Sequence, residues 1–345
     1  MKAPASFRLD RALRALRGRK RCLILMHDNP DPDCLAGAEG LRVLFGKRLH
    51  TTCTIARGGI IGRAENRALV DVLGIDLVPM EKIDPAGFDL VALIDTQPGA
   101  GNNSLPQGVQ AHVVIDHHPL RGPHPGVIWE DIRSSMGASS TIVYEYLRKK
   151  RIPIDARLAT LFLYAIKTET RDLGREATRA EREAYIHLVP KADHDALDRI
   201  AHPKHPREHF EALDRALRNA RLHGHLLAVS LGALDYPDLV AEIADLMLSF
   251  DRSRWVVCVG YHGGAVYLSI RTEVENAHAG GLIRRVVGPD GAAGGHGRIA
   301  GGRMYARVNS DAELAPLYDQ IVRNVCREIG VPFAPSTQLL TQFAR

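Results

Sequence analysis

Short apolar runs that stop abruptly at an acidic or histidine residue are the clearest pattern in the first half of the chain. Three runs end in this way: 22–26 before His27, 88–94 before Asp95, and 112–115 before Asp116. An apolar run without polar alternation is typical of a strand buried on both faces of a parallel sheet. The carboxyl ends of parallel strands meet at one edge, where ligands bind in α/β folds. We therefore expect these polar side chains to lie close together.

Stretches with helical periodicity separate and follow these runs. They cover 35–46, 63–73, 137–150 and 155–167, and residues 6–18 predict a further amphipathic helix. Apolar residues three or four positions apart indicate one buried helix face. Strands that alternate with helices predict an α/β fold with an open, mostly parallel sheet.

The second half of the chain predicts another, smaller α/β domain. Residues from about 176 to 222 are charged and helical, with a break at Pro203 and Pro206. Strand-like runs follow at 226–230, 255–261 and 265–271, with helices near 237–249 and 311–329 and a glycine-rich run at 288–302. We predict an α/β domain over 1–190, a helical connector over 191–222 and a second domain over 223–345.

Composition and charge narrow the class of protein only slightly. The chain has 345 residues, about twice the usual size of one domain. Its 45% hydrophobic and 25% charged residues exclude a disordered or fibrous protein. The net charge of +5 permits an anionic partner without demanding one. Scattered cysteines without a CxxC pair, and the lack of an apolar run long enough to span a membrane, favour a protein of the reducing cytoplasm.

The strongest chemical signal is a histidine and two aspartates directly after the first apolar run. His27, Asp31 and Asp33 follow one another at i, i+4 and i+6, so they can converge from one turn. Imidazole and carboxylate ligands suit Mn²⁺ or Mg²⁺ better than a metal that prefers thiolates. The alternative is a polar turn built around Asn29 and Pro30.

Two further strand ends favour the metal site over the polar turn. Asp95 follows the second run, and Asp116, His117 and His118 follow the third. So many potential ligands at neighbouring strand ends would leave uncompensated charge unless a cation were present. Two metal ions roughly 3.5–4 Å apart use a set of this size, and they can activate water for the hydrolysis of a phosphoester.

These motifs resemble those of the DHH phosphoesterase superfamily, whose namesake Asp-His-His sequence is matched by 116–118. Residues 27–33 resemble the HxxPDxD motif, and Asp95 resembles the lone aspartate that follows a strand. Residues 294–301 are similar to the GGHxxAAG signature of the DHH-associated C-terminal domain, and 269–271 fit its substrate-facing strand. The motifs occur in the expected order and cover most of the chain.

The resemblance implies a role for each motif residue. His27, Asp31 and Asp95 would hold one Mn²⁺, while Asp33, Asp95 and His117 would hold the other, with Mg²⁺ as the alternative ion. Asp95 would then bridge the two ions. His118 would lie near the scissile phosphate, and Asp116 would orient the histidines without binding metal itself.

One position departs from the family pattern. Where related chains carry an aspartate in a Lys-Thr-Asp-Thr segment, this chain has Glu169. Glu169 is one methylene longer, so it can reach a metal from a shifted backbone, and Asp172 is a second candidate. Either the site is slightly remodelled or the affinity for the second ion is reduced.

The glycine-rich run is expected to bind substrate. Backbone N–H groups at Gly294, Gly295 and Gly297 can approach an anion closely, and His296 and Arg298 can add cationic donors. Arg271 can hold a phosphate with two hydrogen bonds. A tight turn is the alternative interpretation. We interpret the remaining histidines as surface or connector residues and not as a second metal site: His202, His205, His209, His223 and His225.

The resemblance implies a Mn²⁺-dependent phosphodiesterase or exonuclease with its active site in a cleft between the two domains. The length favours the compact oligoribonuclease (nanoRNase) and 3′-phosphoadenosine 5′-phosphate phosphatase branch. The expected substrates are short RNA or DNA oligonucleotides and linear dinucleotides, cleaved to 5′-mononucleotides; no membrane partner is expected, and a homodimer is compatible with the sequence. Alternatives are a cyclic-dinucleotide phosphodiesterase, a RecJ-like single-strand exonuclease and, outside the enzymes, a degenerate nucleotide-binding regulator. An inorganic pyrophosphatase is a weaker alternative because that family lacks the glycine-rich signature.

Overall fold

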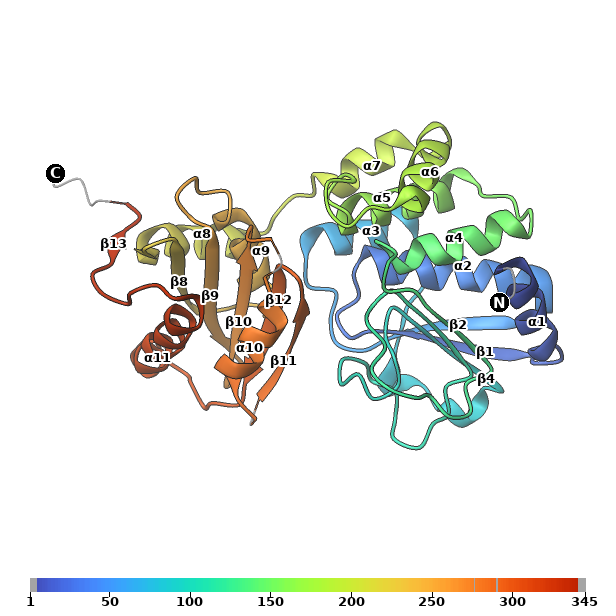
Figure 1. The fold of residues 1–345 in the computed structure, drawn as a ribbon, viewed down its shortest axis with the longest axis horizontal. Helices are drawn as coiled ribbons and strands as arrows, with labels where there is room; N and C mark the ends of the chain where they lie inside the picture. Colours follow the sequence, from blue (N-terminus) through green and yellow to red (C-terminus); the bar gives the residue numbers. More distant parts are fainter. Residues whose placement is uncertain (1–4, 276, 290, 341–345) are drawn as a thin grey trace. The chain divides into compact units, whose positions relative to one another are not determined.

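The chain folds into two compact units, unit 1 over Met1–Pro203 and unit 2 over Lys204–Arg345. The computed structural model describes residues 5–275, 277–289 and 291–340 (Figure 1). The division falls within the segment predicted as a connector. None of the helices in the described part of the chain is long and apolar enough to cross a lipid bilayer.

Unit 1 contains a six-stranded sheet in which every pair of neighbouring strands is parallel. Its strands are β1 (Arg21–Met26), β2 (Thr52–Arg57), β3 (Val78–Pro79), β4 (Leu90–Ile94), β5 (Val113–Asp116) and β6 (Trp129–Ile132). The order across the sheet is β3-β2-β1-β4-β5-β6. Strands β2 and β3 therefore follow β1 on one side of it, and β4, β5 and β6 follow on the other side, so the strand order reverses between β1 and β4. The predicted open parallel α/β sheet is confirmed.

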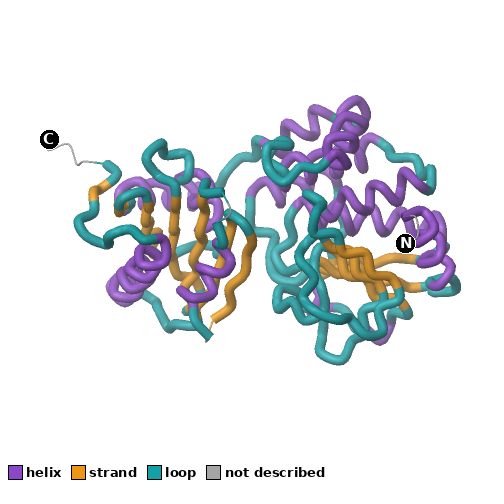
Figure 2. The backbone as a smooth tube through the Cα atoms, viewed as in Figure 1, coloured by secondary structure: helices purple, strands orange, loops and turns teal. Residues whose placement is uncertain are grey.

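The α-helices of unit 1 lie on one face of this sheet, and loops together with the 3₁₀ turn at Met80–Lys82 cover the other (Figure 2). The helices are α1 (Ala5–Ala15), α2 (Pro32–Leu49), α3 (Ala64–Leu73), α4 (Ser139–Lys149), α5 (Ala156–Glu169), α6 (Arg179–Leu188) and α7 (His194–Ala201), with short 3₁₀ turns η1 (Met80–Lys82), η2 (Pro85–Gly87) and η3 (Val189–Lys191). Because strand side chains alternate between faces, Ile24 joins the large core under the helices, while Leu23 and Leu25 join the smaller core under the loops.

One glycine allows helices α2, α4 and α5 to pack closely against one another. A Cβ atom added at Gly40 of α2 would lie 2.7 Å from ring carbon Cζ of Phe162 in α5 and 2.7 Å from Cγ1 of Val143 in α4. That is closer than carbon atoms pack, so a side chain here would push the three helices apart. Since α2 and α4 both begin at the carboxyl edge of the sheet, this packing fixes the spacing of their first turns.

Unit 2 contains a seven-stranded mixed sheet of order β11-β12-β10-β9-β8-β7-β13. Its strands are β7 (Arg221–His223), β8 (Leu226–Ala233), β9 (Trp255–His262), β10 (Ala265–Thr272), β11 (Gly291–His296), β12 (Ile299–Met304) and β13 (Thr337–Gln338), and its helices are α8 (Arg207–Asn219), α9 (Leu239–Met247), α10 (Ala279–Val287) and α11 (Asp311–Ile329). Helices α10 and α11 cover one face, and α8 and α9 cover the other. The predicted second α/β domain is confirmed, and its glycine-rich run forms the β11–β12 hairpin.

The surface interpretation of His223 is wrong. Its side chain is buried at the end of β7, where its ring stacks on Phe333 with 5.2 Å between centroids. Nδ1 of His223 is hydrogen-bonded to the carbonyl oxygen of Phe333. A partner 110 residues away in the chain accounts for the burial, and local sequence patterns give no signal of such a contact.

Candidate active site

The predicted ligands meet where the strand order of unit 1 reverses. Met26 at the end of β1 pairs with Ile94 at the end of β4, and Ile94 pairs with Ile115 in β5. The residues that follow these strands therefore stand side by side at the carboxyl edge. In open α/β sheets this reversal point leaves a crevice in which ligands bind.

Asp95 is at the centre of the cluster. It is buried, and its backbone has a φ of +60°, in the left-handed region that non-glycine residues rarely occupy. Its Oδ2 lies 3.4 Å from Nε2 of His27, while its Oδ1 lies 3.5 Å from Nε2 of His117 and 3.6 Å from Nδ1 of His118. The two carboxylate oxygens thus face two different groups of potential ligands, as a bridging ligand requires.

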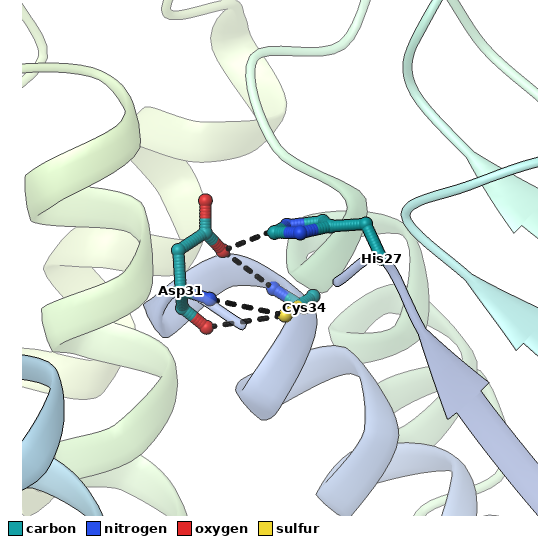
Figure 3. A group of neighbouring side chains, drawn as sticks. All are labelled: His27, Asp31 and Cys34. Carbon is teal, nitrogen blue, oxygen red and sulfur yellow. Dashed lines mark hydrogen bonds and ion pairs between the residues drawn. The ribbon is translucent and has the colours of Figure 1, made fainter. Parts of the chain in front are cut away.

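His27 and Asp31 form the group on the Oδ2 side (Figure 3). Nδ1 of His27 donates to the carbonyl oxygen of Asp28 at 2.9 Å, so Nε2 is the nitrogen that faces the carboxylates. Oδ1 of Asp31 lies 3.6 Å from this Nε2 and also caps α2 by accepting from the N–H groups of Asp33 and Cys34. The helix start therefore holds Asp31 in place.

Cys34 also lies in this group, although no sequence motif indicates a role for it. Its Sγ is 3.3 Å from both the backbone nitrogen and the carbonyl oxygen of Asp31 (Figure 3). Burial raises the pKa of the Cys34 thiol to about 12. Its contacts to the Asp31 backbone make Cys34 a helix-cap partner, and the ligands predicted from the sequence are imidazoles and carboxylates. That donor set fits Mn²⁺ or Mg²⁺.

Ser139 connects the other group, and sequence reasoning missed it. The backbone N–H groups of Ser139 and Ser140, at the start of α4, donate to the two oxygens of Asp33 at 2.7 and 2.9 Å. The Ser139 hydroxyl donates to Oδ1 of Asp95 at 2.8 Å and accepts from the backbone N–H of His117 at 3.1 Å. A serine at the start of the helix predicted over 137–150 was the only available signal.

Asp116 orients one of the two histidines that follow it. Its Oδ1 accepts from Nδ1 of His118 at 2.9 Å, and its Oδ2 accepts from Nε2 of Gln97 at 2.6 Å. His117 is held differently, because its Nδ1 donates to the carbonyl oxygen of Met136 at 3.2 Å. Gln97 is a second residue that sequence reasoning missed. It lies two positions after Asp95, in a loop with no recognisable motif.

Glu169, and not Asp172, belongs to the charged cluster. Burial, together with the charge of Asp31, raises the pKa of Glu169 to about 7. Its Oε1 lies 3.6 Å from the guanidinium of Arg175. The Asp172 side chain is 66% exposed and lies 3.9 Å from Nζ of Lys167. Glu169, the last residue of α5, therefore lies close enough to the other predicted ligands to feel their charge, whereas Asp172 follows the helix and lies in solvent.

The electrostatics of the cluster favour a cation. Burial and the charge of Asp95 raise the pKa of Asp33 well above its usual range. Burial lowers the pKa of His117, but the charges of Asp95, Asp33 and Glu169 outweigh it and raise that pKa to about 9. These groups bind protons more tightly than isolated side chains do because too many carboxylates share a buried space. A divalent cation would neutralise the same excess charge.

The residues predicted to bind substrate in unit 2 lie around the β11–β12 hairpin. Gly294 pairs with Gly301 and Gly295 with Ala300, and Gly297 in the turn has a φ of +42°. The guanidinium of Arg298 lies 4.0 Å from Oε1 of Glu275. The side chain of His296 lies outside the described residues.

Arg271 has a full set of partners inside unit 2. Its side chain is buried, and its Nε donates to Oδ1 of Asp245 at 2.6 Å. A second nitrogen donates to the Ser269 hydroxyl at 2.7 Å and lies 3.4 Å from the carbonyl oxygen of Ala300 in β12. A phosphate would have to displace Asp245 to reach this guanidinium, so its role as a clamp stays a prediction.

A family comparison matches the segment that carries the cluster. Residues 21–166 match one family model. That model is the DHH family, N-terminal domain. All of the predicted ligands except Glu169 fall within the matched residues, and Glu169 follows three positions after its end. The expected resemblance is confirmed for this part of the chain.

Known relatives extend the likeness. An uncharacterized protein of Methanocaldococcus jannaschii is 28% identical over 337 residues, which cover 92% of this chain and 68% of that protein. A probable manganese-dependent inorganic pyrophosphatase of Lactobacillus johnsonii is 26% identical over 168 residues, covering 48% of this chain and 53% of the relative. The crystal structure of an exopolyphosphatase-related protein from Bacteroides fragilis is 14% identical, with a TM-score of 0.72 over 96% of this chain and 99% of that one.

These comparisons confirm the coarse expectations from the sequence. The match to the Bacteroides structure confirms the fold of both units, because it covers nearly the whole of each chain. The DHH match and the manganese-dependent relative agree with the expected class of enzyme, a metal-dependent phosphoesterase. They leave the phosphoester that is cleaved to a proposal.

Proposed function

We propose that the protein is a Mn²⁺-dependent phosphodiesterase that cleaves short oligonucleotides and linear dinucleotides to 5′-mononucleotides. The observation that carries this proposal is the position of Asp95, whose two buried carboxylate oxygens face His27 on one side and His117 on the other. A carboxylate in this position can join two divalent ions. Two-ion sites are typical of enzymes that displace an oxygen from phosphorus.

The proposed ligand sets follow from the contacts around Asp95. His27 and Asp31 would complete the first set, and Asp33, His117 and Glu169 would complete the second. When bound, the two ions supply Lewis-acid stabilisation of the phosphoryl oxygens and lower the pKa of water. The start of α4 holds Asp33 and Asp95 in place for this role.

His118 is the proposed contact to the scissile phosphate. Its Nδ1 donates to Asp116, and that bond fixes the plane of the imidazole and the tautomer. With Nδ1 committed in this way, Nε2 is the nitrogen that we assign to the phosphate oxygen. Gln97 in turn fixes Asp116 by donating to its other oxygen.

The substrate class rests on the second unit. Gly295 and Gly297 both have positive φ values, and the glycines at 294, 295 and 297 leave main-chain N–H groups without bulky side chains beside them; Arg298 adds a positive charge. We assign this hairpin to the phosphates of a short nucleic acid. Arg271 donates to the carbonyl oxygen of Ala300 in β12 and so positions the hairpin. The Asp245 carboxylate in turn fixes the Arg271 guanidinium.

One assay tests the proposal against the alternatives. The purified protein with Mn²⁺ is offered pApA, pGpG, 3′-phosphoadenosine 5′-phosphate, cyclic di-AMP, pyrophosphate and a long single strand. We expect the highest kcat/KM for the linear dinucleotides. A preference for cyclic di-AMP, pyrophosphate or the long strand would replace the proposed substrate. No turnover of any of them by a folded, metal-loaded protein would favour the nucleotide-binding regulator.

Asp95→Asn provides the matched control for this assay. Asparagine tolerates the positive φ of this position better than most residues, so the variant should keep the fold. It replaces one carboxylate oxygen by an amide nitrogen that cannot bind a metal. Activity that persists in this variant would come from a contaminating enzyme or from a mechanism without a bridging carboxylate.

A further inference from the structure

A second cluster of potential ligands lies entirely within unit 2. His205 precedes α8, His209 lies in the first turn of α8, and Glu242 lies on α9. One ligand atom from each residue lies within 4.8 Å of the others. The two imidazoles stack with 4.0 Å between centroids, and Nδ1 of His209 is 3.0 Å from Oε2 of Glu242. His205 and His209 are thus half-buried, and both lie in the segment predicted as the connector.

Two buried polar atoms in this cluster have no hydrogen-bond partner among the described residues. The Glu242 side chain is only 6% exposed, and its Oε2 accepts from His209 and from the Tyr236 hydroxyl at 3.2 Å. Its Oε1 is buried and has no partner, and neither has Nδ1 of His205. Burying a carboxylate oxygen or an imidazole nitrogen without a partner is unfavourable, so something outside the chain is expected to satisfy both.

A simple ion pair does not account for the arrangement. A protonated His209 beside Glu242 would explain the 3.0 Å contact to Oε2. It would leave Oε1 and Nδ1 of His205 unsatisfied, and it would place a second imidazole against a positively charged ring. One cation near both atoms would satisfy them together.

We propose that His205, His209 and Glu242 bind a transition-metal ion of the zinc type. Two imidazoles and one carboxylate form a three-residue set that Zn²⁺ uses, with a fourth position left for water. The set is richer in nitrogen than the carboxylates around Asp95, so it selects for Zn²⁺, Co²⁺ or Ni²⁺ over Mn²⁺ or Mg²⁺. The site is separate from the candidate active site, because all three ligands belong to unit 2.

His205 lies next to the boundary between the two units, so a metal bound there would also affect the segment that joins them. Unit 1 ends at Pro203 and unit 2 begins at Lys204, so His205 is the second residue of unit 2. An ion shared by His205 and Glu242 would attach the start of unit 2 to α9. The bound metal would then fix the end of the segment that joins the two units.

Zinc content measured on full-length protein tests the proposal. Wild type, His205→Ala, Glu242→Gln and His202→Ala are dialysed against Zn²⁺, and the metal bound per chain is determined by mass spectrometry. His202 is the control because it is 77% exposed and pairs with Asp198 outside the cluster. We expect both cluster variants to bind one zinc fewer than wild type and the control to bind the same number. Equal zinc content in wild type and both cluster variants would overturn the proposal.

Two further measurements make the result independent of folding and of the first metal site. The same difference of one zinc is expected in an Asp95→Asn background; its disappearance there would show that the ion belonged to the active-site cluster. Wild type with Co²⁺ should show the visible absorption of a four-coordinate nitrogen-containing site, and His205→Ala should lose that band while keeping its far-ultraviolet circular dichroism. A band unchanged in the variant would refute the assignment.

Discussion

Replacing Ser139 by alanine should weaken the site without removing any proposed ligand. The Ser139 hydroxyl is fully buried and joins Oδ1 of Asp95 to the backbone N–H of His117. Its neighbour Ser140 is equally buried, but its hydroxyl has no hydrogen-bond partner. Both residues donate their backbone N–H to Asp33, and alanine keeps that donor. The two serine-to-alanine variants therefore differ in the hydroxyl contacts that they remove.

The magnitude follows from those contacts. Ser139→Ala leaves the buried N–H of His117 without an acceptor, at a cost of about 1–3 kcal/mol, and removes a hydrogen bond to a carboxylate worth roughly 1.5–3 kcal/mol. Part of this loss of stability is offset because the Asp95 carboxylate, without the serine hydroxyl, still has His27 and His118 as partners. We expect the free energy of unfolding of metal-free protein to fall by about 2–3 kcal/mol for Ser139→Ala and by less than about 0.5 kcal/mol for Ser140→Ala. Metal affinity should fall about 10–100-fold in the first variant only, as for other residues that orient ligands.

Denaturant unfolding in the presence of a chelator measures the first quantity, and calorimetric titration with Mn²⁺ measures the second. A similar loss of stability in both variants would show that the α4 start tolerates no change in volume and that the hydroxyl contacts are unimportant. Unchanged Mn²⁺ affinity in Ser139→Ala would refute the role assigned to this serine in holding Asp95.

Three other outcomes are expected. Asp95→Asn should lower kcat/KM at least about 100-fold with little loss of stability. Asp95→Ala should lower kcat/KM as well and also unfold at a lower temperature, because alanine tolerates a φ of +60° less well than asparagine does. Equal melting temperatures of the two variants would contradict this. In the metal-free folded protein the pKa values of Glu169 and His117 are raised to about 7 and about 9. The folded state therefore binds these protons more tightly than the unfolded chain does, and this stabilisation is lost when the protons dissociate. In the presence of a chelator, the unfolding midpoint in urea should fall as the pH rises from about 5 to about 9. Saturating Mn²⁺ should reverse that trend, and a midpoint that rises with pH in chelator would contradict it. Gly280→Ala would place a Cβ 2.0 Å from the carbonyl oxygen of Gly295 and so displace the β11–β12 hairpin. KM for dinucleotides should therefore rise. An unchanged KM would show that the hairpin does not belong to the proposed substrate site.

The sheet edge and most of its polar residues could be predicted because their signal is local. An apolar run that stops at a polar residue reports a buried strand and its end at once, and this pattern located His27, Asp95 and Asp116 correctly at one edge. The departure at Glu169 was also visible in the sequence. The structure adds that Glu169 faces the cluster while Asp172 stays in solvent.

The supporting contacts could not be predicted because they depend on how distant elements pack. Nothing in the sequence around Ser139 relates it to Asp33, and Gln97 lies in a loop without a motif. The burial of Arg271 depends on Asp245 in a helix on one face of the second sheet. Local patterns report which residues are polar, whereas the identity of their partners is decided by tertiary structure.

The bond between Asp33 and the start of α4 also determines when the site can form during synthesis. Asp33 and Ser140 are 107 positions apart, so every ligand up to His117 has been made before the residues that hold them in place. Long-range contacts of this kind form late, since a long loop must close first. A nascent chain that ends before α4 carries the Asp-His-His sequence without the contacts that hold the proposed ligands, so we expect the proposed metal site to form only after that helix has docked.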